Sequence, residues 1–322
     1  MTFNWSKKPF IYGFVYSLLI VLFHYLLKYQ YNIDISLPWQ PLSVLGISVA
    51  FYLGFKNNSS YDRLWDARKS WGRIVNNSRS FGSCINAFVS GEDDPNIKKT
   101  IIYRHIAWLT ALRFQLRLSR PWEHVLERGD EYPKTMDAAY FAALEKEIAP
   151  YISKAEFDSY RSKSNIAVQI LSTQAEALQH LRNSNYFEDF RHIELSQLIN
   201  SFYEDQGGCE RIKNFPFPRQ YASVAYWGTL VFAMFIPLGI INIFMESNTN
   251  LFWANLPLSS LLIWIFFLME KIGDYSENPF EGTYNDVPIT ALSRGIEIDM
   301  REMINDDNIP EAVTADKDGY LM

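Results

Sequence analysis

The chain has 322 residues, of which 48% are hydrophobic and 20% are charged, and its formal net charge is -6. The negative charge argues against a general nucleic-acid binder, which needs a basic surface. The only two cysteines, Cys84 and Cys209, are too few for a disulfide scaffold, and we expect free thiols. The 9 Trp, 19 Tyr and 23 Phe gather at the ends of apolar runs, which is typical of rings at a membrane interface.

Four segments are long, apolar and almost free of charge. They are Pro9 to Leu27, Ser36 to Phe55, Tyr221 to Met245 and Leu251 to Met269. Each is close to the roughly 20 residues that a helix needs to cross a bilayer. A buried helix of a soluble protein is the alternative for any one segment, but four such runs favour an integral membrane protein.

The basic residues predict how these spans are oriented. Lys7 and Lys8 precede the first span, Lys56 follows the second, Arg219 precedes the third and Lys271 follows the fourth. The short loops 29–35 and 246–250 contain no Lys or Arg. Because loops on the cytoplasmic side are enriched in Lys and Arg, we expect both termini and the middle region to be cytoplasmic, in a multi-pass protein of the inner membrane.

The spans divide the chain into four predicted parts. These are a first transmembrane hairpin (1–55), a polar middle region (56–218), a second hairpin (219–271) and a cytosolic tail (272–322). In the middle region, apolar residues recur at three and four residues, which predicts several helices and no strand. We place helix breaks at 91–95, 128–133 and 206–208, and a tail helix near 288–305. The predicted fold class is all-α, with four transmembrane helices and a helical cytosolic domain.

The second span carries a candidate pore-lining stripe. Ile47, Phe51 and Phe55 are four residues apart and therefore share one face of a helix. Small residues such as Gly46 and Gly54 would let neighbouring helices approach closely. A stripe that faces lipid or the core of the bundle is the alternative. If several subunits place this face on a common axis, the side chains form apolar rings that close a pore by dewetting.

Polar residues continue the same face beyond the span. They are Asn58, Ser59, Asp62 and Asp66. On a pore axis the two carboxylates would form acidic rings, which attract cations. The alternative is that the carboxylates pair along the helix with Arg63 or Lys69.

Two motifs far apart in the chain resemble the bestrophin family, in its bacterial form. One runs from Gly54 to Gly72 and contains Asn57-Asn58-Ser59-Ser60-Tyr61-Asp62-Arg63-Leu64-Trp65; the other is Asn278-Pro279-Phe280 with Asn285-Asp286-Val287-Pro288. The resemblance implies a homopentamer around a central pore, with Ile47, Phe51 and Phe55 at the neck. Animal bestrophins are calcium-activated anion channels and some bacterial relatives pass cations, so the resemblance leaves the selectivity of this chain open.

The resemblance also implies a second constriction and a calcium site. A cytosolic aperture would come from an apolar residue of 165–171, for which Ile166 and Ile170 are the candidates. The acidic run that binds calcium in animal members is replaced here by Glu281-Gly282-Thr283-Tyr284-Asn285-Asp286. Only Asn278 and Asp286 are retained as candidate ligands, and calcium needs more oxygens than two side chains supply. We therefore expect neither calcium gating nor any cofactor.

The sequence thus supports two functions from different classes. The first is an oligomeric channel in contact with membrane lipid, through which small inorganic ions pass, and whose subunits are copies of this chain. The second is a membrane-anchored docking or sensor protein without transport. An enzyme is not expected, because no nucleophile and base stand at a recognisable spacing.

Overall fold

The structure is a computed structural model of the full chain. It describes residues 2–89, 96–124, 135–247, 253–283, 286–315 and 321. Within these residues every regular element is a helix, which confirms the all-α prediction. The helix breaks expected at 91–95 and 128–133 fall outside the described residues.

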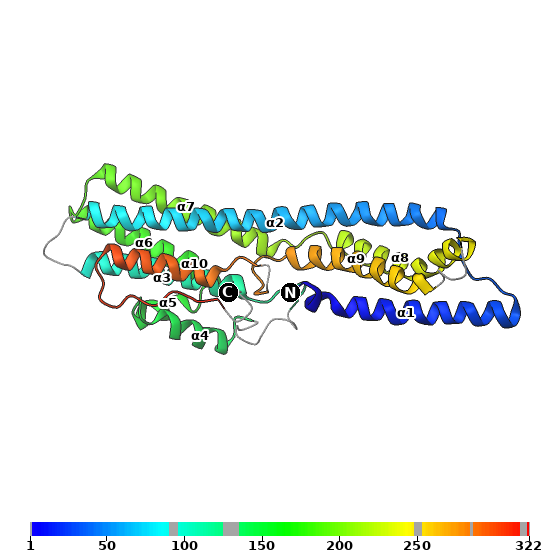
Figure 1. The fold of residues 1–322 in the computed structure, drawn as a ribbon. Helices are drawn as coiled ribbons and strands as arrows, with labels where there is room; N and C mark the ends of the chain where they lie inside the picture. The colour runs from blue at the N-terminus through cyan, green and yellow to red at the C-terminus, as the bar shows by residue number, and fades with distance from the viewer. Residues whose placement is uncertain are drawn as a thin grey trace. The chain divides into compact units, whose positions relative to one another are not determined.

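Ten helices follow one another in the described part of the chain (Figure 1). In order they are α1 (Thr2–Tyr31), α2 (Trp39–Phe88), α3 (Asn96–Arg117), α4 (Ala138–Ile148), α5 (Lys154–Tyr160), α6 (Ile166–Asn183), α7 (Asp189–Asn214), α8 (Arg219–Ser247), α9 (Asn255–Ser276) and α10 (Ile289–Met303). Side-chain oxygens of Asp137, Ser153 and Asn165 accept hydrogen bonds from the first turns of α4, α5 and α6. Such caps satisfy backbone N–H groups that have no partner inside the helix, and so fix where each helix begins.

Three of the described helices, and not the predicted four, are long and apolar enough to cross a membrane. They contain the segments Ser6–Tyr31, Arg219–Phe244 and Asn255–Ser276. The second predicted span, 36–55, begins three residues before the 50-residue helix α2 and continues as its first part. Its hydropathy is lowered by Gln40, Pro41 and several serines.

The chain divides into two compact units. Unit 1 contains 1–62 and 217–277, and unit 2 contains 63–216 and 278–322. In unit 1, α1 and α8 both pack on α9. The first part of α2 belongs to the same apolar core, in which Leu42, Val49 and Leu53 lie with Ile236 and Ile263.

A close helix contact in unit 1 depends on one glycine. A Cβ atom at Gly46 would lie 2.6 Å from Cζ of Phe232. Any larger residue would therefore displace the Phe232 ring or push α2 away from α8. The small residue predicted to allow close approach does so here.

Unit 2 is a helical domain around a second, larger core. Trp71, Trp108, Phe202 and Ile296 are buried there, each no more than 1% exposed. The apolar stripe of α10, which occupies the predicted tail-helix position, packs on α3. The helix break predicted at 206–208 is wrong, because α7 runs unbroken from Asp189 to Asn214.

The reason is that Gln206 and Gly208 serve the packing of α7 against α3 and α2. The side chain of Gln206 accepts a hydrogen bond from Nε1 of Trp108 at 2.8 Å and donates to Oε1 of Glu210. A Cβ at Gly208 would lie 3.3 Å from Oγ of Ser70. The glycine therefore permits a close approach of helices rather than a turn.

Candidate functional site

The first part of α2 has one packed face and one open face. Leu42, Val49 and Leu53 are at most 7% exposed and pack within unit 1. Ile47, Phe51 and Phe55 are 70%, 68% and 56% exposed. Burial of apolar side chains is the main favourable term in folding, so a large open apolar stripe indicates a surface that contacts something else.

Two of the three side chains of the open stripe contact each other. The rings of Phe51 and Phe55 meet edge to face, with centroids 4.7 Å apart. Edge-to-face pairs are a favoured arrangement of aromatic rings, and the contact holds the two side chains one above the other. Together with Ile47 they give α2 a continuous apolar ridge over about two turns.

The polar residues beyond the ridge are accessible, but they differ in their partners. Asn58 and Asp62 are exposed and Ser59 is half-buried. Asp66 is also exposed, and its Oδ1 lies 2.7 Å from Nζ of Lys69. The predicted pairing along the helix is therefore present for Asp66, and its charge is partly compensated.

An open cavity of 630 Å³ lies beside the ridge in unit 1. Phe51, Phe55 and Ser59 line one side of it, and the N-terminal end of α8 lines the other. Tyr52 and Tyr221 also line it, and their rings stack with centroids 5.8 Å apart. The ridge is thus flanked by a concave surface on the same unit.

Lys56, directly after the ridge, is buried. Its Nζ lies 3.0 Å from Oε1 of Glu270 and 3.6 Å from Oδ1 of Asp274, both on α9. The Lys56 side chain is 0% exposed, whereas the sequence predicted a basic residue at the membrane surface. A buried ammonium is tolerated only when it is paired, so this cluster ties α2 to α9.

The two aperture candidates lie in the core of unit 2. Ile166 and Ile170 are 2% and 0% exposed and belong to the core of unit 2. Apolar side chains at the start of α6 pack inward because they form the buried face of this amphipathic helix. Their burial in the single chain does not favour an aperture, and that assignment stays a prediction.

The calcium candidates are engaged in internal contacts. The Asp286 carboxylate accepts hydrogen bonds from the Gly282 and Thr283 backbone N–H groups and lies 3.3 Å from Nη1 of Arg117. Burial raises the pKa of the Asp286 carboxyl to about 6, although Arg117 acts to lower it. Asn278 is 5% exposed. The described residues hold no group of three or more acidic, histidine or cysteine side chains placed to bind a metal.

Sequence reasoning missed a second buried pair next to this loop. Glu281 is 1% exposed and accepts a hydrogen bond from the backbone N–H of His124, whose ring Nδ1 lies 2.9 Å from Oε1. The pair joins positions 157 residues apart. In the sequence, Glu281 is the only charged residue of the segment Pro279-Phe280-Glu281-Gly282, which could have marked it as unusual. Nothing in the sequence indicated that His124 is its partner.

Comparison with known proteins decides the family. The sequence profile described as Bacterial/Fungal Bestrophin protein matches residues 7–302. The chain belongs to the bestrophin family. This confirms the resemblance seen in the two motifs, and with the three apolar helices it makes the chain a membrane protein.

Individual relatives of this bestrophin cover nearly the whole chain. The voltage-dependent anion channel-forming protein YneE of Escherichia coli K12 is 25% identical over 95% of this chain and 88% of its own length. The protein of the same name from Salmonella typhi is 27% identical over 98% of this chain and 96% of its own. The crystal structure of a bacterial bestrophin homologue from Klebsiella pneumoniae has a TM-score of 0.77 at 20% identity, covering 94% of this chain and 99% of that one. At this identity the structural match supports the fold.

Proposed function

We propose that this bestrophin is one subunit of a homopentameric channel that passes small monovalent ions through a central pore. The observation that carries the proposal is the exposed ridge of Ile47, Phe51 and Phe55 on a helix whose opposite face is packed. Relatives with 25–27% identity are named as anion channel-forming proteins, which supports transport as the activity.

In the proposed assembly, the ridges of all subunits meet on the axis and form three stacked apolar rings. Water leaves a narrow apolar constriction readily, and an ion there has no replacement for its hydration shell. The neck would therefore control conduction. The concave surface beside each ridge, lined by Tyr52 and Tyr221, would accept α2 of the neighbouring subunit.

The lower hydropathy of α2 agrees with this position. We propose that its first part crosses the membrane while facing the pore on one side and α8 on the other. Polar residues in a membrane helix face the bundle interior or a water-filled cavity, so a pore-lining helix is less apolar than its neighbours. The expected topology keeps both termini in the cytoplasm.

Selectivity in this scheme depends on Asp62. Its carboxylate is exposed, whereas Asp66 is paired with Lys69. A ring of Asp62 side chains would favour cations. The names of the relatives favour anions, and the reversal potential under a KCl gradient distinguishes the two.

Reconstitution of the purified protein tests the proposal. Planar bilayers that contain it should carry current, and native mass spectrometry should show five copies. Absence of current from intact pentamers would support the alternative, a membrane-anchored docking or sensor protein. A protein that is monomeric in the membrane would contradict the proposal that several subunits surround one pore axis.

A further inference from the structure

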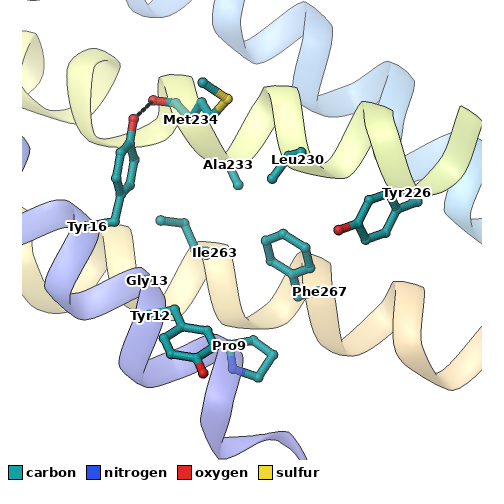
Figure 2. A pocket seen from close by; sticks show the side chains of 10 residues that line it. All are labelled: Pro9, Tyr12, Gly13, Tyr16, Tyr226, Leu230, Ala233, Met234, Ile263 and Phe267. Atoms are coloured by element: carbon teal, nitrogen blue, oxygen red, sulfur yellow. Dashed lines mark hydrogen bonds between the residues drawn. The ribbon is translucent and has the colours of Figure 1, made fainter. Parts of the chain in front are cut away.

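A second cavity in unit 1 lies away from the ridge, among α1, α8 and α9 (Figure 2). Its volume is 340 Å³, within the range of about 300–1,000 Å³ typical of small-molecule sites. It is lined by Pro9, Tyr12, Gly13, Tyr16, Tyr226, Leu230, Ala233, Met234, Ile263 and Phe267. All three helices contain the candidate membrane spans, so the cavity opens where lipid is the solvent.

The walls suit a hydrocarbon chain. No lining residue carries a charge, and the polar atoms are mainly tyrosine hydroxyls. At one end the Tyr16 hydroxyl donates a hydrogen bond to the Met234 carbonyl at 2.8 Å, so this hydroxyl already has a partner within the protein (Figure 2). Tyr226 and Phe267 lie toward the other end. A ligand of this cavity would need an apolar chain. That chain would enter from the side of Tyr226 and Phe267.

Basic residues follow the cavity lining on each helix at that other end. Lys8 directly precedes Pro9 and stands four residues before Tyr12, and Lys271 stands four residues after Phe267. Residues four apart are neighbours on one helix face, so both lysines stand one turn beyond the cavity lining. Nζ of Lys271 lies over the ring of Tyr275, 5.0 Å from its centroid. Arg219 stands two turns before Tyr226 on α8. Basic residues therefore stand one to two turns beyond this end of the cavity lining on all three helices.

We propose that this cavity holds an acyl chain of an anionic phospholipid, whose phosphate is bound by Lys8 and Lys271. Basic pockets between transmembrane helices are a known mode of binding anionic headgroups, and polybasic ends of spans attract anionic lipid surfaces. Burial of the acyl chain in the apolar cavity would add to the electrostatic attraction between the lysines and the headgroup. This proposal rests on the protein being embedded in a membrane, and it does not depend on whether the protein conducts ions.

Native mass spectrometry of the full-length oligomer, with phosphatidylglycerol or phosphatidylcholine of identical chains added, tests the headgroup. Phosphatidylglycerol should remain bound at one molecule per subunit, and phosphatidylcholine should be lost. Lys8→Ala and Lys271→Ala should each weaken phosphatidylglycerol binding about fivefold. Lys7→Ala is the matched control, since Lys7 is also exposed but lies on another face of α1.

A second pair of variants tests the acyl chain. Leu230→Trp fills the cavity and should abolish retention of the lipid, whereas Val231→Trp places the same ring on an exposed neighbour outside the cavity and should not. Unchanged oligomeric state and thermal midpoint would show that both variants are folded.

Equal retention of the two lipids by the unmodified protein would overturn the proposal, as would wild-type binding by Leu230→Trp. A photoreactive side chain introduced at Tyr12 that cross-links to a second copy would assign the cavity to a subunit contact, and would overturn the proposal as well.

Discussion

Nζ of Lys56 lies 3.0 Å from Oε1 of Glu270, although 214 residues separate the two in the chain. Lys56 is fully buried, and it follows Phe55 directly on α2. The pair therefore fixes α2 against α9 at the end of the proposed neck. Removal of one partner from a buried ion pair leaves an uncompensated charge, which costs more than the pair itself contributes.

We predict that Lys56→Ala lowers the free energy of unfolding by about 3–5 kcal/mol. Thermal unfolding of the purified protein in detergent measures the change. Replacement of Lys56 and its nearest partner, as Lys56→Met with Glu270→Leu, should recover most of the loss. The buried ammonium and the Glu270 carboxylate are then removed together, and the remaining Asp274 carboxylate is 34% exposed to solvent. Lys69→Ala is the control, since it breaks an exposed pair with Asp66 and should cost less than about 1 kcal/mol. Equal destabilisation by the two single variants would contradict the burial of Lys56.

Acidification should destabilise unit 2 through His105. Burial lowers the pKa of the His105 imidazole from 6.5 to about 3, and the ring lies among Phe81, Trp108 and Phe202. Between these two pKa values the unfolded chain binds a proton that the folded protein excludes, so stability falls as the pH falls. The free energy of unfolding should drop by about 1.4 kcal/mol for each pH unit below about 6.

The His105→Gln variant tests this pH dependence. It should be less stable than the wild type at pH 7.5, because the ring contacts are lost, but its unfolding midpoint should depend less on pH. His180→Gln, which replaces an exposed histidine, should keep the wild-type pH profile. A wild-type profile in the His105→Gln variant would show that another group is responsible.

The two acidic positions should contribute unequally to ion selectivity. Asp62→Asn removes an exposed carboxylate, whereas Asp66→Asn removes one already paired with Lys69. In bilayers under a KCl gradient, Asp62→Asn should therefore move the reversal potential toward the chloride equilibrium potential by more than Asp66→Asn does. A larger shift from Asp66→Asn would place Asp66, and not Asp62, nearest the axis.

Calcium should leave both conductance and stability unchanged. The Asp286 carboxylate already receives backbone hydrogen bonds from Gly282 and Thr283 and an ion pair from Arg117. A calcium ion would have to displace them to reach the several oxygens that it needs. Currents and thermal midpoints in millimolar calcium and in chelator provide the test, and a shift of either by calcium would contradict these contacts.

Features that depend on local composition could be predicted from the sequence. The apolar runs within α1, α8 and α9 have the length of a membrane span and little charge, so they could be predicted directly. The second span could not be separated from the helix that follows it. Residues such as Asn57 and Ser59 change the hydropathy of α2 without interrupting its backbone hydrogen bonds, so composition gives no helix end there.

Features that depend on distant partners were beyond the sequence. Periodicity showed that Ile166 and Ile170 share an apolar face, but that face could pack in a core or line an aperture, and it packs in the core. The burial of Lys56 and Glu281 depends on Glu270 and His124, which are far away along the chain. For Ile47, Phe51 and Phe55 the sequence predicted one shared face, and their function as a neck stays a prediction.

Conductance of a neck variant tests the central claim most directly. The variant Ile47→Ala, Phe51→Ala, Phe55→Ala widens the three proposed rings and lowers the barrier to hydrated ions. Its matched control is Trp227→Ala, Val231→Ala, Phe235→Ala, which truncates three exposed apolar residues spaced four apart on α8. We predict a several-fold higher single-channel conductance in planar bilayers for the neck variant and wild-type conductance for the control. Wild-type conductance in a folded, pentameric neck variant would contradict the assignment of these three side chains to the pore.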